Sequence, residues 1–268
     1  MLQLRNITKI FSKGTVDEVK ALDGIDLDVK PEDYITIIGS NGAGKTTLLN
    51  VIAGVFPPDE GSVIVSGENV SNMPEYRRAK YVGRVHQDPN VGTGARLTVE
   101  ENLAFSLMRG QPRGLKKALN KERRDNFRKY LEPLGLGLED RLNAFVGTLS
   151  SGQRQAIALS MATISRPTLL LLDEHVANLD PRTAQTVFDL TEMIIERERL
   201  TTLMITHNME IALQYGSRLI MMHRGKIIVD IDDDTKKRLT VKDLIEAFER
   251  AAGEHLVDES ILLSGSER

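Results

Sequence analysis

The first thirty residues alternate between apolar and polar side chains. Segments 2–7 and 25–29 both follow this two-residue period, which is typical of strands with one buried and one exposed face. A polar loop around Gly14 separates the two segments. The pattern therefore predicts a pair of antiparallel strands at the start of the chain.

Further along, short apolar segments alternate with segments of helical period. Residues 34–38 are predicted to form a buried strand, and residues 45–53 a helix that Gly54 closes. A turn at 57–61 precedes another alternating strand. The remaining predicted strands are 62–66, 81–85, 168–173 and 201–206. Strands that alternate with helices favour an α/β fold with a largely parallel sheet.

The middle of the chain has a helical pattern. One helix is predicted to begin near 100–103 and another to cover 121–134, with a break at 110–114 between them. We therefore expect a helical subdomain over about 88–165, inserted into the α/β core of a single domain that spans residues 1–250.

The last part of the chain is predicted to add only peripheral structure. An acidic turn follows Asp230, and a helix is expected over 241–251. The final segment, 251–268, is polar and is expected to fray.

Composition narrows the class of protein. The chain has 268 residues, of which 41% are apolar and 27% charged, as in an average globular protein. Its net charge of −3 argues against a nucleic-acid partner, and the absence of cysteine excludes disulfides and thiolate metal sites. No apolar stretch approaches the roughly 18 residues that a membrane span needs. We therefore expect any membrane role to come through a partner.

A glycine-rich loop lies between the predicted strand 34–38 and the predicted helix 45–53. Residues 39–46 match G-x-x-x-x-G-K-[ST], in which backbone N–H groups surround phosphates at a helix N-terminus. Lys45 would supply charge at the β- and γ-phosphates, and Thr46 a hydroxyl for Mg²⁺. The expected phosphate-binding residues are Gly39, Ser40, Asn41, Gly42, Ala43, Gly44, Lys45, Thr46 and Thr47.

A second candidate site ends the apolar segment 169–172. Asp173 and Glu174 follow it directly, so both carboxylates are expected at the carboxyl edge of the sheet, where the phosphate loop also lies. We expect Asp173 to hold Mg²⁺ through water and Glu174 to polarise the attacking water. Acidic residues also end many strands without any catalytic role. The catalytic interpretation of Asp173 and Glu174 therefore depends largely on the presence of the phosphate loop.

The segment Leu-Ser-Ser-Gly-Gln at 149–153 opens a predicted helix. By itself it could be a serine-capped helix start. It resembles the L-S-G-G-Q signature of ATP-binding cassette (ABC) ATPases, with Ser151 in place of the first glycine. Four other matches follow the family order, although each alone would be an ordinary polar or core residue. They are Phe11 for the adenine-stacking aromatic, Gln87 for the Q-loop, 177–180 for the D-loop and His207 for the switch histidine.

This resemblance implies a P-loop NTPase core with an antiparallel β-flap and an inserted helical signature subdomain. It also implies an ATPase that uses ATP and Mg²⁺, in which two copies pack head to tail around two ATP molecules. Glu174, His207 and Lys45 would be catalytic, and Thr46, Gln87 and Asp173 would hold the metal. The remaining nucleotide contacts implied by the family are Phe11, Ser150, Gly152, Gln153 and Asp180.

Two residues depart from the family pattern. Ser151 carries a Cβ, which a left-handed backbone would disfavour. His175 follows the expected catalytic glutamate, where proline or alanine is more usual. Neither change removes a group that the chemistry needs.

The single cassette resembles the separate ATPase subunit of a bacterial transporter. Residues 98–103 resemble the T-V-x-E-N-L run of importer and lipoprotein-exporter subunits. Residues 173–180 resemble those of uptake systems related to branched-chain and aromatic amino-acid importers. The implied partners are a membrane permease, which would meet the segment 86–94, and a solute-binding protein. The implied location is the cytoplasmic face of the membrane. A regulatory or scaffolding ATPase of division or repair, or an exporter subunit, is the alternative, and the cargo is not encoded in this chain.

Overall fold

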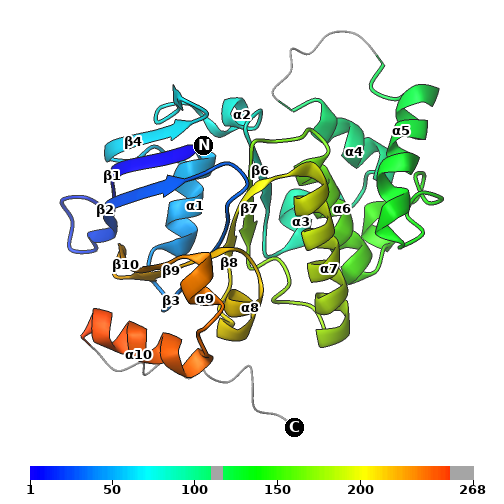
Figure 1. Cartoon of the computed structure of the whole chain (residues 1–268). Coiled ribbons are helices and arrows are strands. Elements are labelled where there is room, and N and C mark those ends of the chain that lie inside the picture. The colour runs from blue at the N-terminus through cyan, green and yellow to red at the C-terminus, as the bar shows by residue number, and fades with distance from the viewer. Residues whose placement is uncertain (110–116, 254–268) are drawn as a thin grey trace. The chain divides into compact units, whose positions relative to one another are not determined.

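The computed structural model describes residues 1–109 and 117–253 (Figure 1). These residues form two compact units, one built from residues 1–75 together with the chain from 201 onward, and one from residues 76–200. The break expected at 110–114 lies outside the described residues. The tail beyond Gly253 also lies outside them.

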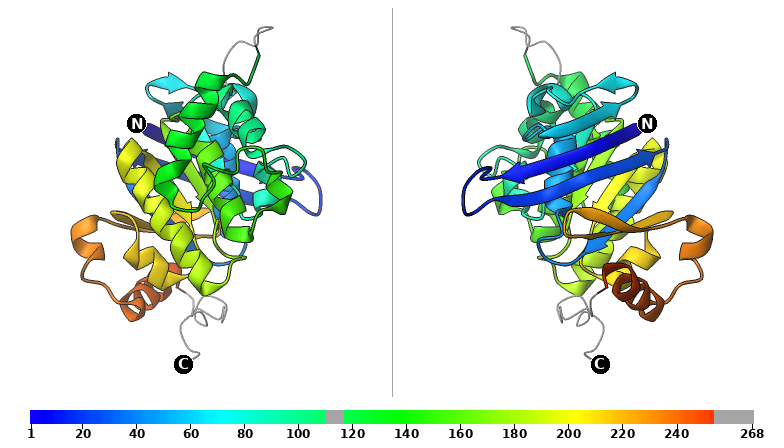
Figure 2. Two further views of the ribbon diagram at one scale, coloured as in Figure 1. Left: turned by 90° about the vertical axis from the view of Figure 1, so that its right-hand side faces the viewer. Right: turned by 90° about the vertical axis from the view of Figure 1, so that its left-hand side faces the viewer.

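The N-terminal strands of the first unit form an antiparallel sheet in the order β2-β1-β4-β5. Leu2 and Leu4 of β1 are fully buried and Gln3 between them is exposed, as the two-residue period predicts. The period then breaks, because the register with β2 shifts between Leu4 and Ile7 and Asn6 has a φ of 49°, so that Ile7 is buried and Asn6 is exposed. Figure 2 shows β1 and β2 side by side in its right-hand view. The strands are β1 (Leu2–Phe11), β2 (Val19–Val29), β4 (Glu60–Val65) and β5 (Glu68–Asn69).

A second set of strands in the same unit surrounds β3 (Tyr34–Gly39), which is buried along its whole length. β3 pairs in parallel with β8 (Thr201–Ile205) and with β9 (Arg218–His223). β10 (Lys226–Ile231) pairs antiparallel with β9. The apolar run of β3 is thus a central strand, as its continuous hydrophobicity predicts.

Helices of the first unit follow the ends of these strands. α1 (Lys45–Ala53) begins directly after the glycine-rich loop, and Gly54 ends it in a left-handed conformation, as predicted. α8 (Met209–Gln214) follows β8. α9 (Asp233–Lys236) replaces the acidic turn expected there, because Asp232 caps it and two further aspartates lie in its first turn.

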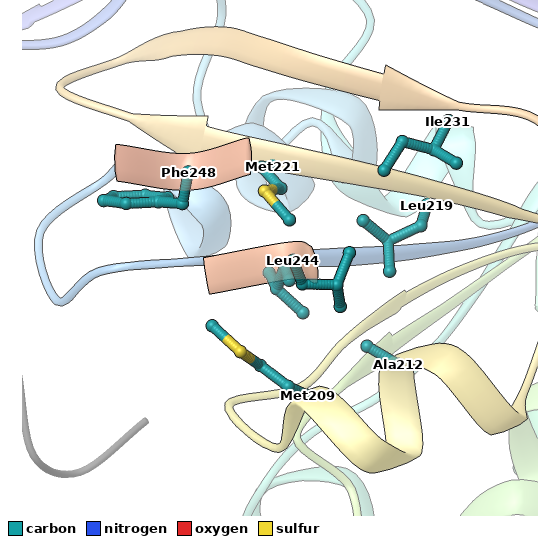
Figure 3. Packing of buried hydrophobic residues seen from close by; sticks show 8 residues of the cluster. Met209, Ala212, Leu219, Met221, Ile231, Leu244 and Phe248 are labelled. Atoms are coloured by element: carbon teal, nitrogen blue, oxygen red, sulfur yellow. The ribbon is translucent and has the colours of Figure 1, made fainter. Parts of the chain in front are cut away.

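The C-terminal helix α10 (Val241–Ala252) packs onto β9 and β10. Its side chains Leu244 and Phe248 enter an apolar cluster that strands and α8 complete (Figure 3). A Thr240 capping box fixes its first turn. The cluster consists of Ile38, Met209, Ala212, Leu219, Met221, Ile231, Leu244 and Phe248.

The second unit contains a parallel pair of strands and most of the long helices. β6 (Val82–Val85) pairs with β7 (Leu169–Asp173). The helix predicted over 121–134 ends at Leu131 and continues as a 3₁₀ turn, η1 (Glu132–Leu134), which contains Pro133. The other elements are α2 (Glu75–Arg78), α3 (Pro89–Gly92), α4 (Val99–Leu107), α5 (Lys121–Leu131), η2 (Val146–Thr148), α6 (Ser151–Thr163) and α7 (Pro181–Glu198).

The helices α3 to α6 fall within the expected subdomain of about 88–165, whose limits, like those of the 1–250 domain, stay predictions. Across residues 1–109 and 117–253, no helix combines the length and apolar character needed to cross a bilayer.

Candidate nucleotide-binding and catalytic site

The glycine-rich loop connects β3 to α1 and is tightly enclosed by backbone. A Cβ at Gly39 would lie 2.1 Å from the carbonyl oxygen of Met222, and one at Gly44 would lie 2.3 Å from that of Ala21. These approaches leave no room for a side chain at either position. The first turn of α1 carries no acidic residue, so its positive end is available to an anion.

Lys45 is folded back onto the loop that precedes it. Its Nζ donates to the carbonyl oxygens of Gly39 at 2.6 Å and Ser40 at 3.0 Å, and the residue is buried. The lysine therefore holds the loop in shape from inside. A cradle of this kind, with a cation and a helix N-terminus, fits the phosphates of a nucleotide.

The turn of the β9–β10 hairpin supports the same loop. Gly225 donates its N–H to the carbonyl of Ala43 at 3.1 Å and accepts from the N–H of Asp23 at 2.9 Å. Ser40 Oγ lies 3.5 Å from Nδ1 of His223 at the end of β9. Sequence reasoning missed this support, because the apolar runs around Arg224-Gly225 are short and only the glycine of this pair is a preferred hairpin-turn residue.

Phe11 ends β1 and is 38% exposed. Its ring meets Phe56 edge to face at a centroid distance of 5.3 Å, and Lys9 Nζ lies 5.9 Å from its centroid. Phe11 pairs with Val19 of β2, two residues before Ala21, whose carbonyl adjoins Gly44. An exposed aromatic face therefore belongs to the same small region as the phosphate loop.

His207 follows β8, beside the strand that leads into the loop. Thr206 donates its N–H to the carbonyl of Ile37 at 3.2 Å, which keeps the two strand ends together. Asn208 then caps α8 by accepting from the N–H of Ile211. The first unit thus brings together Phe11, the phosphate loop and the histidine that follows β8.

In the second unit, β7 ends in the two expected carboxylates. Asp173 is only 8% exposed, and its Oδ2 accepts from Arg84 Nη2 at 2.8 Å. Glu174 adopts a φ of 49°, a left-handed conformation that is rare outside glycine. The chain turns sharply at this residue, directly after the buried strand.

His175 is buried in the packing between β7 and α7. Its Nε2 lies 3.2 Å from Thr191 Oγ1, and its ring meets Phe188 edge to face. Burial lowers the pKa of His175 from 6.5 to about 4. His175, which departs from the family pattern, is therefore a buried histidine that is neutral at physiological pH.

The signature segment begins α6 with a capping box. Ser150 accepts from the N–H of Gln153, whose side-chain oxygen accepts from the N–H of Ser150. Neither Ser151 nor Gly152 has a positive φ, so the strain that Ser151 could have introduced does not arise. A Cβ at Gly152 would lie 2.6 Å from Thr183 Cγ2 in α7.

Arg154 of α6 links the signature to the segment after β6. Its guanidinium donates to Asn90 Oδ1 at 3.0 Å and to the carbonyls of Gly147 and Leu149. Gln87 is exposed beside these residues, and Asp88 caps α3. A pocket of about 220 Å³ lies here, lined by Gln87, Asp88, Pro89, Asn90, Ser151, Arg154, Gln155, His175, Asn178 and Leu179.

Asp180 caps α7 at the end of the D-loop segment. Its side chain accepts from the N–H of Thr183 at 3.1 Å, and hydrogen bonds from Thr183 lower the pKa of its carboxyl. The second unit thus holds Gln87, Asp173, Glu174, the signature and Asp180.

Comparison with known proteins identifies the family of this chain. The ABC transporter family model matches residues 22–177, a range that includes the phosphate loop, the signature and both carboxylates. The chain belongs to the ABC transporter family. The P-loop core with an antiparallel flap is confirmed, since solved ABC cassettes share this fold. This ABC protein is an ATPase, and ATP and Mg²⁺ are its cofactors.

Relatives of this ABC ATPase include transport proteins of bacteria. It is 41% identical to a tyrosine transport ATP-binding protein of Clostridioides difficile over 251 residues, which cover 94% of this chain and 100% of that protein. It is 33% identical to an energy-coupling factor transporter ATP-binding protein of Acetivibrio thermocellus, over 84% of this chain and 78% of that one.

Solved cassettes resemble this ABC ATPase over most of its length. A dimeric cassette in a post-hydrolysis state, bound to ADP and Pi, matches with a TM-score of 0.73 and 28% identity over 87% of this chain and 99% of that one. A cassette in its ADP conformation matches with a TM-score of 0.75 and 29% identity over 92% and 98%.

Proposed function

We propose that this chain is the ATP-hydrolysing subunit of a membrane importer for a small solute, most specifically an aromatic amino acid. The observation that carries this proposal is the end-to-end similarity to a protein named for tyrosine transport. Two copies close head to tail around two ATP molecules and drive a permease, on the cytoplasmic face of the membrane. A solute-binding protein delivers the cargo.

Residues 39–47 bind the phosphates in this proposal. Backbone N–H groups of the loop and the first turn of α1 face the anion, and the enclosed glycines let the backbone come close. Lys45 exchanges its two carbonyl partners for the β- and γ-phosphates. Phe11 offers its exposed ring to the adenine.

Thr46, Gln87 and Asp173 hold Mg²⁺. Among the described residues, no three or more His, Cys, Asp or Glu side chains are placed to hold a metal ion by themselves. Mg²⁺ usually keeps several waters and is bound through one or two carboxylates together with substrate phosphates. When bound, Mg²⁺ neutralises charge that develops on the phosphates. Thr46 supplies an oxygen ligand of the type that this ion prefers, and Asp173 holds the ion through water.

Glu174 and His207 act on the reacting groups. Glu174 orients the attacking water and accepts its proton. In support of this role, the residue lies in a sharp turn directly after β7, with a φ of 49°. His207 donates a hydrogen bond to the γ-phosphate, while Lys45 stabilises the charge that builds up in the transition state.

The signature acts on the nucleotide held by the second copy. Ser150, Gly152 and Gln153 lie at the N-terminal end of the thirteen-residue helix α6, whose positive end favours a γ-phosphate. Asp180 contributes from the D-loop. Hydrolysis removes that phosphate and so weakens the closed dimer.

The permease docks beside Gln87. Val91 in α3 lies four residues after Gln87 and is 67% exposed, so a helix of the permease can reach it. The test is co-purification of the chain with a co-expressed candidate permease. Val91→Asp is expected to release the permease, whereas Val16→Asp, at a fully exposed valine in the loop between β1 and β2, is expected to retain it. Equal retention by both variants would exclude this docking surface, and failure of the wild type to co-purify would favour a regulatory ATPase.

A further inference from the structure

An arginine of the neighbouring strand holds the aspartate at the end of β7. Arg84 and Asp173 form an ion pair of 2.8 Å in which their side chains are only 10% and 11% exposed. Water screens such a pair less than it screens a surface pair. The guanidinium therefore occupies one oxygen of this carboxylate and compensates its charge at short range.

The strand register explains how the two side chains meet. Arg84 lies opposite Leu171 in the parallel pair β6–β7, and Leu171 and Asp173 share one face because side chains alternate along a strand. The long arginine side chain spans the two-residue offset. On the other face of β6, a Cβ at Gly83 would lie 2.2 Å from the carbonyl of Ala162, so that face packs against α6.

In the proposed function, the Asp173 carboxylate that pairs with Arg84 also holds Mg²⁺. A carboxylate already neutralised by a guanidinium attracts Mg²⁺ less strongly, and the guanidinium itself repels the ion. We propose that Arg84 sets the metal dependence of nucleotide binding: it holds Asp173 while no metal is bound and yields a carboxylate oxygen when Mg²⁺ arrives with ATP. This inference rests on the metal-binding role proposed for Asp173.

The experiment measures ATP affinity of the full chain twice, once in EDTA and once in excess Mg²⁺. The dissociation constant in EDTA divided by the one in Mg²⁺ measures how strongly the metal favours nucleotide binding. Arg84→Gln is expected to raise this ratio about tenfold, and Arg84→Lys, which keeps the positive charge, to leave it within about threefold of wild type. The control Arg128→Gln removes an arginine from an exposed pair with Asp125 on α5 and should not change the ratio.

An unchanged or smaller ratio in Arg84→Gln would overturn the proposal, and so would an equal rise in Arg84→Lys. A second measurement needs only the nucleotide-free wild type. Millimolar Mg²⁺ alone should not raise its midpoint of thermal unfolding, because Arg84 already holds Asp173, and a clear rise would also overturn the proposal.

Asp173→Asn separates this inference from the proposed function. If that variant keeps the wild-type ratio, the metal role of Asp173 is wrong and the role of Arg84 falls with it. If Asp173→Asn abolishes the coupling while Arg84→Gln leaves it unchanged, only the inference about Arg84 fails.

Discussion

At the scale of single residues, Glu174 combines backbone strain with a position at the end of a buried strand. Its φ of 49° costs on the order of 1–3 kcal/mol for a residue other than glycine. Such strain persists only where the surroundings enforce it, and it is common at active sites. The sequence shows the carboxylate, but the conformation that aims it depends on the packing of β7.

Glu174→Gln is expected to keep ATP affinity and to lower the rate of hydrolysis about a hundred- to ten-thousand-fold, because the amide cannot accept a proton from water. Phosphate release and equilibrium nucleotide binding measure the two effects. The matched control, Glu196→Gln on the exposed side of α7, should hydrolyse ATP at the wild-type rate. Turnover near the wild-type rate in Glu174→Gln would contradict the catalytic role.

His175 makes stability depend on pH. Because its pKa falls from 6.5 to about 4 on folding, the unfolded chain binds a proton between these values while the folded chain stays neutral. Stability is therefore lost as the pH falls below 6.5, and the full loss is about 3 kcal/mol.

Urea unfolding tests this pH dependence. Between about pH 7 and about pH 5, His175 should account for a loss of about 2 kcal/mol in the free energy of unfolding. His175→Gln can still form a hydrogen bond with Thr191. Over the same pH range, its free energy of unfolding should fall by about 2 kcal/mol less than that of the wild type. An identical loss in the variant would show that other groups cause the pH dependence.

At the scale of elements, the structure matches the sequence where periodicity and end signals agree. β3 and α1 are predicted within one residue because a wholly apolar run is followed by the loop and a helix that Gly54 closes. The β9–β10 hairpin was not predicted. Residues 219–222 give only a short apolar run, and the pairing of β9 with β3 is a long-range contact that no local pattern reveals.

The contact between α6 and α7 explains why position 152 is glycine. Gly152→Ala places a Cβ against Thr183 Cγ2, and the clash should disappear in Thr183→Ser, which lacks that methyl group. A double-mutant cycle is expected to give a coupling free energy of about 1 kcal/mol in unfolding experiments. Additive effects of the two substitutions would mean that the helices adjust without strain.

α10 is held mainly through its apolar face (Figure 3). Leu244→Ala, at a fully buried position, is expected to cost about 2–5 kcal/mol and to speed hydrogen exchange along α10. Arg250→Ala, on the exposed side of the same helix, should change neither quantity. Unchanged exchange in Leu244→Ala would show that this helix is held by other contacts.

At the scale of the whole molecule, the candidate site draws on residues from Phe11 to His207. Motif order along the chain predicts the candidate residues, and the structure places them at strand ends and at helix N-termini in two units. Support from side chains is harder to predict. The ion pair of Arg84 with Asp173 and the link from Arg154 to Asn90 depend on register and helix packing, which single positions do not show.

The net charge of −3 predicts weak attraction to membrane lipid. The purified chain is expected to remain in the supernatant when it is centrifuged with anionic phospholipid vesicles at physiological salt. The same vesicles carrying the reconstituted permease should bring it down. Strong sedimentation with bare vesicles would contradict attachment through a permease.

The folded-back position of Lys45 has a consequence for the thermodynamics of ATP binding. The Lys45 ammonium already donates hydrogen bonds to two backbone carbonyls of the loop. Nucleotide binding then exchanges hydrogen bonds: Lys45 gives up its bonds to the carbonyls when it bonds to phosphate. The enthalpy gained from the new bonds is partly offset by the enthalpy lost with the old ones. The loop loses little conformational entropy because it is ordered beforehand. Calorimetry should therefore record a smaller heat than the number of phosphate contacts implies.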